Sequence, residues 1–146
     1  IINDSVKTAM EADPAGVHVG QQDMRISEAR RMLGEEKIIG ASARTVEQAL
    51  KAESEGADYL GVGAVFGTNT KQDAKTIDRK LLREICDAVK IPVVAIGGVS
   101  EENIMELAGT GAAGVAVVSA VFAKEDIMGA AKALRNMAGR LFGQQT

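Results

Sequence analysis

The chain has 146 residues, of which 46% are hydrophobic and 25% charged, and its formal net charge is -3. These values are typical of one globular domain, and the absence of a basic run argues against nucleic acid as a partner. No apolar run approaches the ~20 residues of a membrane span, and the single cysteine, Cys86, suits a reducing compartment, so we expect a cytoplasmic protein without a membrane partner.

Short runs rich in β-branched residues predict strands along the whole chain. They cover residues 1–2, 16–19, 37–42, 58–66, 91–98 and 114–122. With no Trp, one Tyr and three Phe, the core must consist mainly of aliphatic side chains. That composition is typical of parallel strands covered by helices, so we expect strands that are buried on both faces.

Amphipathic segments between these runs predict helices with recognisable ends. Their expected starts are Ser27, Thr45, Asp78, Ser100 and Asp126. Thr45 and Gln48 fit a capping box, in which each side chain accepts a bond from the other residue's backbone N–H. Gly34 and Gly56 are suited to end the two helices that precede them.

The regular alternation of strands and helices indicates an α/β fold with a parallel sheet. Strand-helix units of about 25 residues fill the chain, which allows an open doubly wound sheet of six strands. A (β/α)₈ TIM barrel needs eight units, so the chain would lack two at its N-terminal side. Because the first residues already read as the end of a strand, the pattern favours the barrel.

Polar residues follow the predicted strands, and in either fold they would gather at one edge of the sheet. Asp4 and Asp23 come from adjacent strands, which suits a Mg²⁺ ion that keeps waters and is shared with a phosphate. Each could instead cap the helix that follows it. His18, between Val17 and Val19, reads more readily as a packed structural histidine than as a catalyst.

Two further stretches suit phosphate binding. Gly97-Gly98 and Val118-Ser119 offer backbone N–H groups that could cradle a phosphate, although a Gly-Gly pair can also be only a tight turn. Lys71 lies in a loop with Thr68 and Thr70, where its charge could stabilise a departing phosphate. A lysine on an exposed loop is also often simply solvated.

Six stretches together resemble the thiamine-phosphate synthase family, also called thiamine-phosphate pyrophosphorylase. In order they read IIND, GVHVGQQDM, KIIGAS, ADYLGVGAVFGTNTKQDA, IPVVAIGGVSEENI and GVAVVSAVF. The resemblance implies a (β/α)₈ barrel, of which residues 1–146 would be a single domain holding the last six units. It also implies condensation of hydroxymethylpyrimidine pyrophosphate with hydroxyethylthiazole phosphate to thiamine phosphate and pyrophosphate. The implied mechanism is a dissociative displacement in which the thiazole nitrogen captures a carbocation-like pyrimidine.

The resemblance also implies roles for individual residues. It places Asp4 and Asp23 on Mg²⁺, and Asn3 on the pyrimidine. Ser42 would lie near the reacting centre as a catalytic and substrate-binding residue. The remaining implied contacts are Lys71 on pyrophosphate as a catalytic group, Thr68 and Thr70 toward the thiazole substrate, and Gly98, Val118 and Ser119 around the thiazole phosphate.

The chain departs from the family pattern at three places. Ala64 and Gly67 stand where the family usually has prolines, Arg44 stands where a histidine is common, and the two N-terminal units that help grip the pyrimidine pyrophosphate are missing.

Two alternatives remain open. A thiazole tautomerase of the same pathway shares the barrel, but lacks the paired acids and the Thr-x-Thr-Lys loop. The chain could also be an inactive phosphate-binding fragment, whose two unpaired strand edges could pair between copies into a homo-oligomer.

Overall fold

The aliphatic runs form a parallel sheet, in the order in which they occur along the chain. The computed structural model describes residues 1–67 and 76–143. The strands are β1 (Ile2–Asn3), β2 (Gly16–Val19), β3 (Ile38–Ala43), β4 (Tyr59–Gly63), β5 (Val93–Ile96) and β6 (Gly114–Ala116). They make one six-stranded sheet in the order β1 to β6, and each neighbouring pair is parallel. The predicted α/β class and parallel sheet are therefore confirmed.

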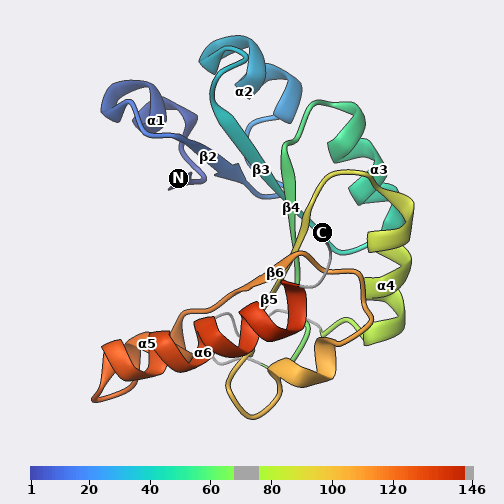
Figure 1. Cartoon of the computed structure of the whole chain (residues 1–146). Helices are drawn as coiled ribbons and strands as arrows, with labels where there is room; N and C mark the ends of the chain where they lie inside the picture. Colours follow the sequence, from blue (N-terminus) through green and yellow to red (C-terminus); the bar gives the residue numbers. More distant parts are fainter. Residues whose placement is uncertain (68–75, 144–146) are drawn as a thin grey trace.

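Helices follow the strands and lie in an arc around the curled sheet, which gives the molecule the form of a half-barrel (Figure 1). They are α1 (Val6–Ala12), α2 (Ile26–Leu33), α3 (Val46–Ser54), α4 (Arg79–Ala88), the 3₁₀ helix η1 (Ile104–Leu107), α5 (Ser119–Phe122) and α6 (Ile127–Phe142). In the part of the chain that the structure describes, no helix has the length and apolar character needed to cross a membrane.

The two faces of the sheet differ sharply in burial. On the face toward the helices, alternate residues such as Val17, Ile39 and Leu60 are completely buried. On the opposite face, His18 and Tyr59 are only half-buried. The expectation of strands buried on both faces is therefore wrong, because the curl leaves its inner face partly open.

Most predicted helix ends are found, with some differences in detail. Asp78 and Asp126 cap α4 and α6 by accepting backbone N–H bonds from Leu81 and Gly129. Thr45 caps α3 as predicted, but its expected partner Gln48 accepts the N–H of Arg44 rather than that of Thr45.

Other boundaries were predicted wrongly. Ser100 caps no α-helix: the Asn103 side chain closes this turn by accepting from the Ser100 N–H, and only the short η1 follows. The segment 114–122 is not one strand, since its second half forms α5. Short apolar runs fit a strand and a buried helix equally well. Helix α1 follows β1 as expected, but Ser5 caps it rather than Asp4.

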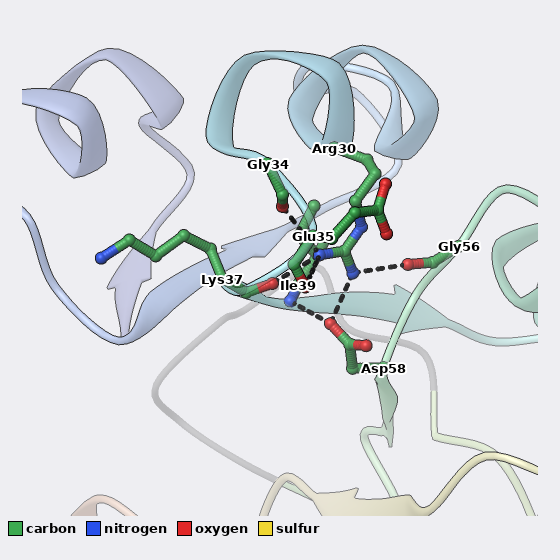
Figure 2. Close-up of polar contacts among 7 residues, drawn as sticks. All are labelled: Arg30, Gly34, Glu35, Lys37, Ile39, Gly56 and Asp58. Atoms are coloured by element: carbon green, nitrogen blue, oxygen red, sulfur yellow. Dashed lines mark hydrogen bonds and ion pairs between the residues drawn. The ribbon is translucent and has the colours of Figure 1, made fainter.

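One arginine joins three segments at the start of β3 and β4 (Figure 2). The Arg30 guanidinium, on α2, donates to the carbonyl oxygens of Lys37 and Gly56 and pairs with Asp58 at 2.6 Å. The Asp58 carboxylate also accepts the Ile39 N–H at 2.7 Å. The Arg30 side chain is 14% exposed, so water competes little for these bonds.

We expect Arg30→Met to lower the free energy of unfolding by about 2 kcal/mol, because several carbonyl and carboxylate acceptors lose a charged donor. Urea unfolding monitored by circular dichroism measures the change. Arg31→Met, on the exposed side of the same helix, is the matched control and should change stability by less than about 0.5 kcal/mol. Equal effects of the two substitutions would contradict the assigned role of Arg30.

Candidate functional site

The carboxyl ends of the first two strands bring Asn3 and Asp4 to the candidate site. Asn3 is paired in register with His18, and the N–H of Asp4 donates to the His18 carbonyl at 2.8 Å. Asp4 has a left-handed backbone with a φ of 68°, which is uncommon for a residue other than glycine. Its side chain is exposed at the edge of the sheet.

Asp23 lies in the turn after β2. Its carboxylate accepts the Gly20 N–H at 2.7 Å and so closes the turn from Gly20 to Asp23. It caps no helix: α2 begins after Arg25 without a side-chain cap bond. Asp4 also caps no helix, since Ser5 accepts the Thr8 N–H at the start of α1. The capping alternative for both acids is therefore wrong.

The two acids fit a Mg²⁺ ion in their chemistry. They are exposed carboxylates on the ends of neighbouring strands, and Mg²⁺ commonly binds one or two carboxylates while waters and phosphate oxygens complete its octahedron. Within residues 1–67 and 76–143, no group of three or more His, Cys, Asp or Glu residues could enclose a metal.

Ser42 lies near the end of β3 and is held from two sides. Its hydroxyl is 2.9 Å from the Nε2 atom of His18. The side-chain amide of Gln21 donates to the backbone carbonyl of Ser42. On the other side of the imidazole, the Nδ1 atom of His18 is 2.9 Å from the Tyr59 hydroxyl. Burial raises the pKa of the Tyr59 phenol above its ordinary value.

Tyr59 is a member of the candidate site that was not predicted from the sequence, and Gln21 is a member that was assigned no role. Two glycines inside strands, Gly40 and Gly61, could have indicated the position of Tyr59. Glycine is unfavourable inside a strand unless a neighbouring group needs the space that a side chain would fill. A Cβ atom at Gly40 would come within 2.2 Å of the Tyr59 ring, and one at Gly61 would lie 3.0 Å from the His18 ring.

The residues predicted to bind the phosphate follow β5 and β6. Gly98 has a φ of 68°, and a Cβ there would lie 2.3 Å from the Gly67 carbonyl oxygen, so the close approach requires glycine. Val118 and Ser119 are exposed where β6 gives way to α5. Ser100, in the loop after β5, and Ala120, on α5, line one pocket of about 230 Å³ together with Lys124. The loop after β5 therefore lies next to α5.

The predicted site residues Thr68, Thr70 and Lys71 lie outside the described residues. Arg44 lies directly after β3, one residue beyond its end. Cys86, which is packed against the core on α4, has its thiol pKa raised to about 11, mainly by burial. A thiol of this kind is unsuited to act as a nucleophile at neutral pH.

Comparison with known proteins adds to this geometry. A family model described as thiamine monophosphate synthase matches residues 1–121. The thiamine-phosphate synthase of Clostridium tetani is 48% identical over 134 residues, which cover 92% of this chain and 64% of that protein. The relative of the same description from Methanobrevibacter smithii is 54% identical, covering 83% of this chain and 58% of its own length.

A solved structure, thiamine phosphate pyrophosphorylase from Pyrococcus furiosus, superposes with a TM-score of 0.88 at 45% identity. The match covers 97% of this chain and 67% of that one. The chain thus spans 58% to 64% of the length of the two curated relatives described above. Its sequence and its fold agree in one assignment: the chain belongs to the thiamine monophosphate synthase family.

Proposed function

We propose that this chain carries most of the active site of a thiamine-phosphate synthase. The reaction would join hydroxymethylpyrimidine pyrophosphate to hydroxyethylthiazole phosphate, with release of pyrophosphate. The observation that carries the proposal is the placement of Asn3, Asp4, Ser42 and Gly98 along the carboxyl edge of one parallel sheet, in a chain 48% identical to a synthase relative.

We further propose that the half-barrel is six units of a complete (β/α)₈ barrel. Within the described residues, β1 and β6 each pair with one neighbour only, as expected where two more units would complete the closure. The coverage of 64% of a curated relative is in keeping with this arrangement.

Asp4 and Asp23 are the residues that would hold Mg²⁺, and the ion would supply positive charge to neutralise the departing pyrophosphate. Two contacts support this role: the Gly20 N–H orients the Asp23 carboxylate, and the bond from the Asp4 N–H to the His18 carbonyl holds the Asp4 backbone at the end of β1. Asn3, paired in register with His18, would contact the pyrimidine.

The other residues would position the two substrates and stabilise charge. Lys71 would contact the pyrophosphate, and Thr68 and Thr70 the thiazole substrate. The backbone N–H groups of Gly98, Val118 and Ser119 would hold the thiazole phosphate. In a dissociative displacement the C–O bond to pyrophosphate breaks before the thiazole nitrogen attacks, so catalysis depends on positioning and leaving-group stabilisation and needs no protein nucleophile.

The central experiment is a synthase assay with both substrates and Mg²⁺. It compares this chain with a longer version in which the two preceding units of a relative are restored. We expect thiamine phosphate to form with the longer version and little or none with the 146-residue chain alone. Absence of product in both would refute the synthase proposal, and equal turnover in both would refute the need for eight units.

Substitution of Asp23→Asn tests the metal site in the active version. We expect turnover to fall about 100-fold, because a charged ligand is lost. Stability should change by less than about 1 kcal/mol, because the Asn oxygen can still accept the Gly20 N–H. Asp87→Asn, an exposed acid on α4, is the control and should leave the rate unchanged. An unaltered rate for Asp23→Asn at saturating Mg²⁺ would remove this residue from the metal site.

Substitution of Gly98→Ala tests the phosphate cradle. We expect the KM for the thiazole phosphate to rise at least ~10-fold, since the new Cβ displaces the loop that binds it. Gly109→Ala is a matched control: this residue also has a positive φ, of 73°, but nothing lies within 4 Å of its Cβ position. It should show only the cost of backbone strain, about 1 kcal/mol of stability, with an ordinary KM. Equal KM values in the two variants would contradict the proposal that the loop at Gly98 binds the thiazole phosphate.

A further inference from the structure

Three side chains on the inner face of the sheet form a continuous hydrogen-bonded chain that leads to the candidate site. It runs from the Tyr59 hydroxyl to Nδ1 of His18, and from Nε2 of His18 to the Ser42 hydroxyl, with both distances 2.9 Å. The three residues come from β4, β2 and β3, respectively. The hydrogen-bonded chain of side chains therefore joins three strands and ends at Ser42, near the carboxyl edge of the sheet.

The strand between the two rings makes this contact feasible. His18 and Tyr59 are both paired in register with Gly40 of β3 and so lie on either side of it. Because Gly40 has no side chain, the rings meet across β3, with their centroids 5.4 Å apart. Ser42 lies two residues further along β3, on the same face, which is where Nε2 of the imidazole meets it.

The chemistry of the three groups indicates which of them donates and which accepts in each of the two hydrogen bonds. A phenol is a stronger acid than an aliphatic alcohol, so the Tyr59 hydroxyl is the better donor to a neutral imidazole nitrogen. Burial disfavours the phenolate, so Tyr59 keeps its proton. A neutral imidazole whose Nδ1 accepts from Tyr59 has its own proton on Nε2, from which it would donate to the Ser42 oxygen. The Ser42 proton is then directed away from His18.

We propose that Tyr59 and His18 are positioning residues that fix Ser42 as a hydrogen-bond donor facing the substrate. The acceptor would be an anionic oxygen of the leaving pyrophosphate. This inference rests on the proposed synthase function for its acceptor. The direction of the hydrogen-bonded chain itself rests only on the contacts among the three side chains.

The first test needs no turnover. His18 is the only histidine in the sequence, so long-range ¹H–¹⁵N correlation spectra of the uniformly labelled protein report a single imidazole. We expect the Nε2–H tautomer at neutral pH, and a substantial fraction of the Nδ1–H tautomer in Tyr59→Phe. An Nδ1–H tautomer in the unaltered protein, or no change in Tyr59→Phe, would overturn the proposed direction even if the synthase assay succeeds.

The second test uses two substitutions that each keep one half of the imidazole contacts. The amide nitrogen of His18→Gln can take the place of Nε2 and still donate to Ser42, whereas His18→Asn can replace only Nδ1. In the active version of the synthase, we expect kcat within ~10-fold of normal for His18→Gln and lowered about 100-fold for His18→Asn, with KM changed little. Equal losses of kcat would mean that His18 is only a packing residue.

A double substitution shows whether His18 acts through Ser42. In a Ser42→Ala background, His18→Asn should lower kcat by no more than ~3-fold further, because the group that it positions is already gone. A full additional loss of about 100-fold would show that His18 acts independently of Ser42 and would overturn the inference. If the synthase assay fails altogether, the imidazole spectra still decide whether the hydrogen-bonded chain has the proposed direction.

Discussion

The parallel, sequential order of the six strands is the constraint on which the candidate site depends. Because every strand runs in the same direction, all six carboxyl ends meet at one edge, and residues far apart along the chain become neighbours there. Helix α1, strand β2 and helix α2 lie between Asp4 and Ser42 in the sequence. His18 of β2 nevertheless contacts both, the Asp4 N–H through its carbonyl and the Ser42 hydroxyl through its ring. Strand order, rather than any single motif, therefore assembles the site.

Glycines give the inner face of the sheet its room for polar groups. In β3 and β4 the residues that face the helices are aliphatic and fully buried, such as Ile39 and Leu60. The inner positions include Gly40 and Gly61, where a Cβ would collide with Tyr59 or approach His18 closely. The same short strands thus contribute buried aliphatic side chains to the core on one face and leave space for the His18 and Tyr59 rings on the other.

Much of this fold could be predicted from the sequence, because its signals are local. The period of apolar residues and the acids at Asp78 and Asp126 act over a few neighbouring residues, and those strands and caps are found. The segment 114–122 was misjudged since an apolar run does not distinguish a strand from a buried helix. His18 was expected to be a packed residue because it lies between Val17 and Val19. Its contacts with Tyr59 and Ser42 could not be predicted, since these partners are distant in sequence and only strand register brings them together.

The helix starts near β1 and β2 explain why two acids remain available at the edge. Helix α1 is capped by the Ser5 hydroxyl, one residue beyond Asp4, so the Asp4 carboxylate is not used by the first turn of the helix. Asp23 satisfies the Gly20 N–H within its own turn, which holds the carboxylate in place but leaves it exposed. A carboxylate that accepts one backbone bond still has lone pairs for a cation. Local capping by a serine and local turn closure by Asp23 are therefore compatible with a metal-binding role for both acids.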